Sequence, residues 1–349
     1  MRPRDRLLAA VVAVLWGVNF LAIHFGLTHF PPMLLACLRF TLIAIPTILF
    51  VPRPAVPLRW FLGYGIGFGT LQFVFLFVAM DVGMPTGLAS LVLQSSAPLT
   101  VVLGVLLLRE RPSRRQVVGI GAAALGLAAI AAAQSQSAAL VPVLLTLLAG
   151  LSWAVGNLCA RLAAPPEPMH LTLWACVVPP VPLLVLSLAT EGPAADLEAL
   201  RTAFTPSGWV GIGAVVYLVV FATIIGSGIW TALIRRYPAG VVAPYSMLVP
   251  IIGMSSAALV LGERPGIVEI VAGAVVVGGV LLGSARPAAQ AGTAEEPVDG
   301  SASGTDDPAP PRCPGANERP FPATEPVRAA VGATRRPDSE AVDREGAGQ

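Results

Sequence analysis

Ten long apolar stretches, separated by short breaks, constrain this sequence more than any other feature. The hydrocarbon core of a bilayer is about 30 Å thick, and a helix needs about 20 apolar residues to cross it. The stretches are Leu7–Leu27, Leu34–Val51, Phe61–Met80, Gly87–Leu108, Gln116–Ala133, Val141–Leu162, Leu171–Thr190, Trp209–Leu233, Val241–Leu261 and Ile267–Gly283. A helix satisfies its own backbone polar groups in lipid. The sequence therefore predicts an all-α integral membrane protein with ten transmembrane helices.

The charged residues are few and unevenly distributed. They make up 12% of the chain, against about 25% in a soluble domain, and 17 of the 42 lie after Pro287. The segment Pro287–Gln349 has ten prolines and an excess of acidic over basic residues. Such a segment cannot bury enough apolar area to fold, so we expect a disordered cytoplasmic tail over 287–349. Neither part has the charge pattern of a nucleic-acid-binding protein.

The loop arginines predict the orientation in the membrane, because cytoplasmic flanks retain basic residues during insertion. When successive spans alternate in direction, the segments on one side of the membrane hold thirteen arginines. They are Arg2, Arg4, Arg6, Arg53, Arg59, Arg109, Arg111, Arg114, Arg115, Arg161, Arg235, Arg236 and Arg286. The segments on the other side hold only Arg201 and Arg264. The first apolar stretch runs on to Leu27 without a cleavage site, which indicates a retained helix and not a signal peptide. We expect a multi-pass protein of the cell membrane with both termini in the cytoplasm.

The chain also contains an internal repeat. A shift of 153 positions pairs Pro85, Gly87, Leu106, Leu108, Glu110, Arg111 and Pro112 with Pro238, Gly240, Leu259, Leu261, Glu263, Arg264 and Pro265. The predicted repeats are residues 5–133 and 138–284. Each contains five spans, an odd number, so the two repeats cross the membrane in opposite senses. Inverted repeats with a binding site between them are typical of alternating-access transporters.

Several short motifs resemble one transporter family. They are Leu15-Trp16-Gly17-Val18-Asn19-Phe20, Leu38-Arg39-Phe40, Gly87-Leu88-Ala89-Ser90-Leu91-Val92-Leu93-Gln94, Glu110-Arg111, Ala243-Pro244 and Gly262-Glu263-Arg264. Together they resemble the EamA repeats of the drug/metabolite transporter superfamily, over residues 5–284.

Three further motifs narrow the resemblance. Pro31-Pro32-Met33-Leu34-Leu35-Ala36, Gly83-Met84-Pro85 and Gly226-Ser227-Gly228-Ile229-Trp230 are similar to the bacterial branch that exports O-acetylserine and cysteine-pathway metabolites. The resemblance implies export of amino acids or their derivatives. Two departures from the pattern are His24, where many members carry Lys, and the polar segment Ser95-Ser96-Ala97-Pro98.

Polar residues near the middle of the spans form the candidate substrate site, because polar groups at that depth are costly in lipid. They are Trp16, Asn19, Gln72, Gln94, Ser95, Ser96, Trp153, Asn157, Tyr217, Thr223, Tyr245 and Ser246. These neutral amides, hydroxyls and rings suit a small polar or zwitterionic metabolite. The alternative is that they only join helices through hydrogen bonds.

A second group of residues predicts gating. Arg39 lies about two turns into the second span from the outer face, Asp81 ends the third span at that face, and His24 ends the first. A buried arginine needs a partner. We expect Arg39 to pair with Asp81 or with backbone carbonyls, either as an outer gate or as a structural ion pair. Pro98, Pro244 and Pro250 are expected to interrupt the fourth and ninth spans, either at the binding site or only for packing.

The sequence lacks enzyme, metal and cofactor motifs. It has no HExxH, GxSxG or Walker sequence, and its cysteines have no metal-ligand spacing. A membrane enzyme acting on lipid-linked substrates, and a carrier of another metabolite or drug, are the alternative functions. Coupling is either facilitated efflux or proton antiport. The titratable candidates for antiport are His24, Asp81, Glu110, Glu263 and Glu269, with Asp81 and His24 preferred.

Overall fold

Every regular element in the described residues is a helix. The computed structural model describes residues 1–135, 140–237 and 239–284, and all of them belong to one unit. The expected tail after Pro287 lies outside the described residues. The all-α prediction is confirmed for the part of the chain that the structure describes.

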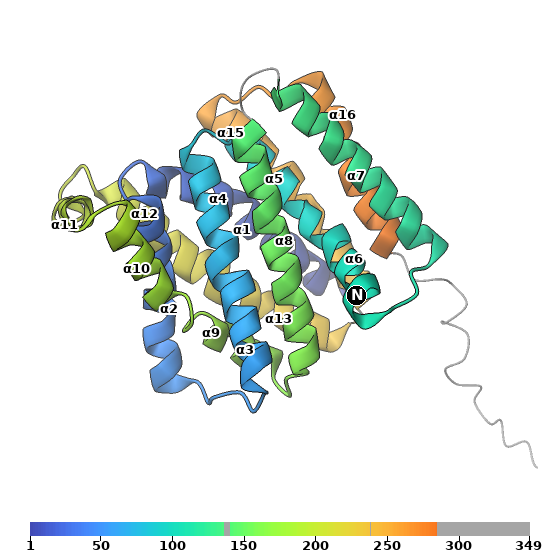
Figure 1. Cartoon of the computed structure of the whole chain (residues 1–349), viewed down its shortest axis with the longest axis horizontal. Coiled ribbons are helices and arrows are strands. Elements are labelled where there is room, and N and C mark those ends of the chain that lie inside the picture. Colours follow the sequence, from blue (N-terminus) through green and yellow to red (C-terminus); the bar gives the residue numbers. More distant parts are fainter. Residues whose placement is uncertain (136–139, 238, 285–349) are drawn as a thin grey trace, which may run out of the picture. The chain divides into compact units, whose positions relative to one another are not determined.

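The ten predicted spans correspond to helices or runs of helices (Figure 1). The first repeat contains α1 (Pro3–Leu27), α2 (Pro32–Phe50), α3 (Leu58–Tyr64), η1 (Gly65–Leu71), α4 (Gln72–Asp81), α5 (Thr86–Val92), η2 (Leu93–Ser95), α6 (Ser96–Leu108) and α7 (Arg114–Ser135). The second contains α8 (Leu140–Ala163), α9 (Pro168–Ala175), α10 (Pro180–Thr190), α11 (Pro193–Thr202), α12 (Trp209–Val216), η3 (Tyr217–Ile225), α13 (Gly226–Arg236), α14 (Ala239–Ser246), α15 (Leu248–Leu261) and α16 (Ile267–Ser284).

The number of spans agrees with the prediction. Nine described segments are long and apolar enough to cross a membrane, and Ile267–Gly283 is a shorter apolar helix at the tenth position. The short helix α11 lies between the seventh and eighth spans, outside the predicted apolar stretches. It is a polar helix, with Asp196, Glu198 and Arg201 along its length.

Matching spans of the two repeats are interrupted at matching places. The third and eighth spans each contain a π-helical segment, η1 and η3, and such segments are frequent at functional sites. The fourth span breaks at η2, and the ninth breaks at Met247, between α14 and α15. The repeat shift of 153 pairs Gln94 with Met247, and Gln94 Nε2 lies 3.6 Å from Met247 Sδ. The two breaks therefore meet where the repeats face each other.

The two breaks lie within one turn of the prolines that the sequence singled out, but not at the prolines themselves. Pro98 and Pro250 are each the third residue of the helix that follows a break. A proline is tolerated in the first turn of a helix, where its missing N–H has no intrahelical partner to lose. Pro244 lies inside α14.

Glycines bring the third span into close contact with α8. A Cβ on Gly67 would lie 2.9 Å from the backbone N of Gly156 and 2.9 Å from the backbone O of Ser152. A Cβ on Gly63 would lie 2.6 Å from Cys159 Sγ. Small residues allow backbones to approach in this way in membrane proteins.

The fifth and tenth spans, α7 and α16, pack side by side (Figure 1). A Cβ on Gly119 would lie 2.4 Å from Gly279 O, and one on Gly126 would lie 2.7 Å from Ala272 O. The same shift of 153 pairs Gly119 with Ala272 and Gly126 with Gly279, so the two contacts are related by the repeat.

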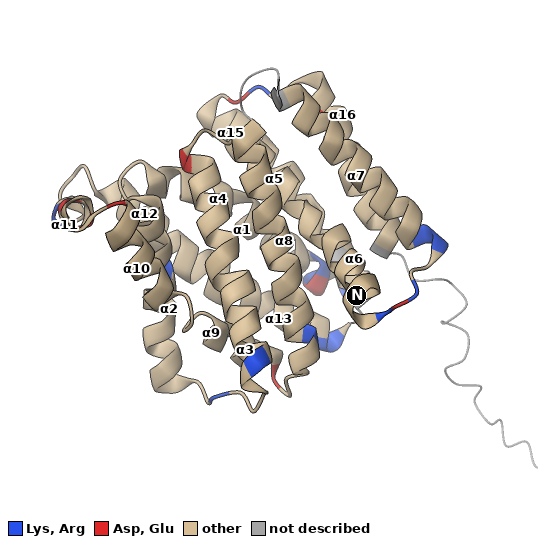
Figure 2. Ribbon diagram, viewed as in Figure 1, with Lys and Arg blue, Asp and Glu red and all other residues tan. Residues whose placement is uncertain are grey.

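Basic residues collect at one end of the spans, which we call the basic end (Figure 2). Polar contacts between the repeats or between helix ends occur there: Tyr237 Oη donates to Asp5 Oδ2 at 2.6 Å, and Arg235 pairs with Glu167 at 2.7 Å. Arg161 pairs with Glu110, and this hydrogen bond lowers the pKa of the Glu110 carboxyl.

At the opposite end, carboxylates of the second repeat hold helix N-termini of the first. Glu263 accepts hydrogen bonds from the backbone N of Thr86 at 2.7 Å and of Gly87 at 2.9 Å. Glu191 accepts from the backbone N of Met33 at 2.6 Å and of Leu34 at 3.2 Å. A carboxylate at a helix N-terminus satisfies unpaired N–H groups and interacts favourably with the helix dipole.

The arginine distribution predicts that the basic end faces the cytoplasm. Reporter fusions at Ala138 and Gln290, two positions outside the described residues, test this prediction. A periplasmically active enzyme should work at Ala138 and a cytoplasmic fluorescent protein should fold at Gln290. Reporters that place both positions on the same side of the membrane would contradict it.

Candidate functional site

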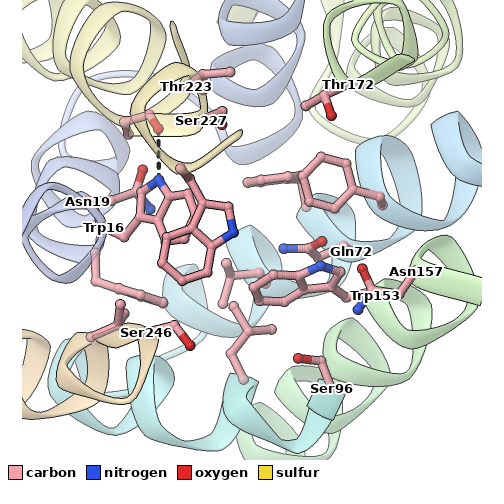
Figure 3. Close-up of a pocket in the computed structure, with 18 of the residues that line it drawn as sticks. Trp16, Asn19, Gln72, Ser96, Trp153, Asn157, Thr172, Thr223, Ser227 and Ser246 are labelled. Carbon is pink, nitrogen blue, oxygen red and sulfur yellow. Dashed lines mark hydrogen bonds between the residues drawn. The ribbon is translucent and has the colours of Figure 1, made fainter. Parts of the chain in front are cut away.

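A cavity of about 310 Å³ lies between the two repeats (Figure 3). Its walls come from the first four spans and from the sixth to ninth spans. The lining residues are Trp16, Asn19, Phe20, Arg39, Phe40, Phe68, Gln72, Phe73, Leu76, Leu93, Gln94, Ser96, Ala97, Trp153, Asn157, Thr172, Cys176, Ala222, Thr223, Ser227, Trp230, Ser246, Met247 and Val249. No Asp or Glu is among these described lining residues.

The structure brings most of the expected substrate-site residues to this cavity. Those that line it are Trp16, Asn19, Gln72, Gln94, Ser96, Trp153, Asn157, Thr223 and Ser246. Figure 3 shows Trp16 and Asn19 on one side of the space, and Gln72, Trp153 and Asn157 on the other. A tryptophan and an asparagine of the first span thus lie across the cavity from a tryptophan and an asparagine of the sixth span.

Three expected residues do not line the cavity. The Tyr217 hydroxyl donates to the backbone O of Leu15 at 3.0 Å, which ties η3 to α1. Tyr245 packs against a separate apolar cluster that contains Leu233. Ser95 is buried against Gly150 of α8. All three side chains therefore point away from the cavity.

Aromatic rings form much of the cavity wall. Trp16 Nε1 donates to the backbone O of Ala222 at 2.9 Å, the bond drawn in Figure 3. The ring centroids of Trp16 and Trp230 are 5.2 Å apart, and those of Phe68 and Trp153 are 6.2 Å apart. Rings at these separations make favourable edge or tilted contacts and leave their remaining faces available to a ligand.

Arg39 lies in the cavity wall and does not pair with Asp81. Its residue exposure is 7%, whereas Asp81 at the end of α4 is exposed, and no described salt bridge joins them. The expected ion pair is therefore wrong. Arg39 Nη2 instead donates to Thr223 Oγ1 at 3.0 Å, and its guanidinium carbon lies 4.5 Å from the centroid of the Phe73 ring. Thr223 belongs to η3, where its hydroxyl also donates to Leu218 O five residues earlier.

The cavity residues carry both donors and acceptors without partners. Arg39 Nε and Nη1 are buried and have no hydrogen-bond partner among the described residues. The same is true of two acceptors, Asn19 Oδ1 and Gln72 Oε1. Buried polar groups in folded proteins are normally paired, so these atoms are suited to bind polar groups of a ligand.

The other expected gating residues do not line the cavity. His24 is half-buried in the last turn of α1, edge-on to Phe25 at 5.6 Å. Pro98, Pro244 and Pro250 are not among the lining residues. Among the described residues there is also no group of three or more His, Cys, Asp or Glu side chains that could hold a metal ion.

Several lining residues were not expected from the sequence. Phe68, Phe73 and Trp230 occur in apolar runs, where a ring facing the cavity has no distinctive pattern. Trp230 does end one of the motifs that carried the resemblance, and Met247 is the repeat partner of Gln94. Both could have been found from the repeat and the motif together.

The sequences of the two repeats match the model of a known protein family. The model of the EamA-like transporter family matches residues 6–132 and 140–285. The chain belongs to this family. It is therefore a transporter and not an enzyme.

Two similar proteins are named "Probable amino-acid metabolite efflux pump". One, from Salmonella typhimurium, is 42% identical over 288 residues, which cover 81% of this chain and 95% of that protein. The other, from Escherichia coli, is 43% identical over 270 residues, covering 76% and 89%. A solved crystal structure with 20% identity has the same fold, with a TM-score of 0.55 over 81% of this chain and 96% of its own.

Proposed function

We propose that the protein is an alternating-access exporter of small zwitterionic metabolites, of the amino-acid type such as cysteine or O-acetylserine. The observation that carries this proposal is Arg39, a buried cation in a cavity whose described lining has no acidic residue. A buried charge without a partner is costly. A carboxylate on the substrate supplies that partner, and guanidinium groups bind carboxylates through two parallel hydrogen bonds.

The rest of the cavity suits the ammonium group of the same substrate. Asn19 Oδ1 and Gln72 Oε1 are acceptors without partners among the described residues. The faces of Trp16 and Trp153 add an attraction for a cation. A zwitterion thus satisfies the donors and the acceptors together, whereas a simple amine or a simple acid satisfies only one kind.

Alternating access is supported by the inverted repeats. The cavity lies between them, and interrupted spans from both contribute to its wall, as in other transporters built from inverted repeats. The direction of transport is inferred from the two relatives named as efflux pumps, because such a mechanism has no direction of its own.

Competition in proteoliposomes tests the substrate class. Uptake of labelled cysteine or O-acetylserine by counterflow should be inhibited by unlabelled amino acids. The corresponding amines without a carboxylate should compete at least ten times more weakly, because they cannot bind Arg39. Equal competition by the amine and the amino acid would refute the role of the carboxylate, and an absence of any counterflow would refute the substrate class.

A further inference from the structure

A second polar site lies at the end opposite the basic end, outside the cavity. Ser187 is near the end of α10, Glu191 follows that helix, and Asp196 lies in the first turn of α11 (Figure 1). Ser187 Oγ is 2.8 Å from Glu191 Oε2 and 2.7 Å from Asp196 Oδ2. One hydroxyl oxygen therefore contacts carboxyl oxygens of two acids at hydrogen-bond distance.

The number of hydrogens decides what this arrangement requires. A serine hydroxyl has one hydrogen, and an ionised carboxylate has none. If both acids were ionised, one of the two short contacts would join lone pairs without a hydrogen between them. A proton on Asp196 removes the conflict, because the acid then donates to Ser187 Oγ and Ser187 donates to Glu191. Glu191 is the better anion, since it also accepts from the backbone N of Met33 and Leu34.

The burial of Asp196 gives independent support. Its exposure is 5%, and its Oδ1 has no hydrogen-bond partner among the described residues. No described salt bridge involves Asp196 or Glu191. A buried carboxylate with an unsatisfied oxygen and no cation beside it is costly.

The surrounding titratable groups do not provide that cation. Cys37 of α2 is a thiol, which carries no positive charge, and its Sγ contacts Thr41 and Pro180. His29, in the α1–α2 connection, uses its Nε2 to contact the backbone O of Ala199 at 3.0 Å. On α11 itself, Glu198 and Arg201 are exposed.

We propose that Ser187, Glu191 and Asp196 form a proton-binding site that couples transport to a proton gradient. The coupling half of this inference rests on the proposed function. Loss of the proton leaves two carboxylates with one hydroxyl between them, and their repulsion weakens the hold of Glu191 on the N-terminus of α2. The same helix carries Arg39 into the cavity and contacts α10 again where Cys37 Sγ lies 3.5 Å from Pro180 O. A shift of α2 therefore links the proton to the substrate site.

Infrared spectroscopy of the purified wild-type protein tests the proton site without any transport assay. At neutral pH the spectrum should contain the C=O band of a buried carboxylic acid. The band should be absent in Asp196→Asn, and it should move in Ser187→Ala because the acid loses its acceptor. Glu198→Gln, which removes an exposed carboxylate from the same helix, is the matched control and should keep the band. A wild-type spectrum without an acid band, or a band retained in Asp196→Asn, overturns the proton site.

Flux measurements in proteoliposomes test the coupling. An imposed pH gradient should accelerate efflux of labelled amino acid by wild type and by Glu198→Gln. In Asp196→Asn the gradient should have no effect, while exchange of labelled for unlabelled substrate continues. Gradient-driven flux retained in Asp196→Asn, or driven by a sodium gradient in wild type, overturns the coupling. A failure of the proposed function differs from these outcomes, because exchange would then be absent from wild type while the infrared band remained.

Discussion

Replacement of Arg39 by leucine is expected to lower the affinity for an amino-acid substrate by about 100-fold. The substitution removes the only cation among the described lining residues. Loss of one partner from a buried charge pair costs about 2–5 kcal/mol, and about 2.8 kcal/mol corresponds to a factor of 100 in the dissociation constant. Binding of a labelled amino acid to the purified protein measures the effect.

Stability separates a binding role from a structural one. Without substrate, Arg39 is a buried charge with one side-chain hydrogen bond to Thr223, and replacing such a charge by an apolar residue is often neutral or stabilising. The Arg39→Leu protein should therefore unfold at the same temperature as wild type or a higher one. Arg39→Lys keeps the positive charge but not the planar guanidinium group that binds a carboxylate through two hydrogen bonds. Its affinity should therefore lie between those of Arg39→Leu and wild type.

Arg59 offers a matched control. It is an exposed arginine on α3 whose guanidinium carbon also lies over an aromatic ring, 4.9 Å from the centroid of Trp60. Arg59→Leu should leave substrate affinity unchanged. Unaltered affinity in Arg39→Leu, or the same loss in both variants, would contradict the assignment of Arg39 to the substrate carboxylate.

The spans and the repeat could be predicted from the sequence because both depend on composition and order alone. A run of apolar residues must be long enough to cross the bilayer, whatever it packs against. The repeat shift of 153 was equally informative, since it pairs Gln94 with Met247 at the two breaks and Gly119 with Ala272 in the α7–α16 contact.

The site was harder to predict because depth along a span does not determine which way a side chain points. Counting residues placed Tyr217 and Tyr245 near mid-span with Trp16, but Tyr217 binds the backbone of α1 and Tyr245 packs in a separate apolar cluster. Arg39 was placed near the outer face by counting residues, yet its long side chain reaches Thr223 in the cavity wall.

The breaks and the acidic site illustrate two other limits. Proline positions suggested where the fourth and ninth spans would be interrupted, but proline fits the first turn after a break as well as the break itself. Asp196 and Glu191 lie outside the apolar stretches, where acids are ordinary. No pattern in the sequence indicated that α11 packs against the end of α10 and buries Asp196 beside Ser187.

The largest loss of stability is expected from Gly119→Leu. A Cβ at this position would lie 2.4 Å from the backbone O of Gly279, and the obstruction is backbone that cannot rotate away. The leucine must therefore separate α7 from α16. Overpacking of a tight contact costs about 1–3 kcal/mol, and we expect the upper end, about 3 kcal/mol, because the crossing is held by small residues in both helices. Thermal unfolding in detergent measures the change, with the fraction of protein that stays monodisperse after heating as the readout.

Gly121→Leu is the control for this substitution, two residues further along the same helix. No atom of the described residues outside the local helix lies within 4 Å of a Cβ at Gly121, so a leucine there meets open space. Both variants replace a helical glycine by leucine and thus gain the same helix propensity, about 1 kcal/mol. Gly121→Leu should therefore be as stable as wild type or slightly more stable, and the difference between the two variants isolates the α7–α16 contact. Equal stability of the two variants would mean that α7 and α16 do not pack at Gly119 in the folded protein.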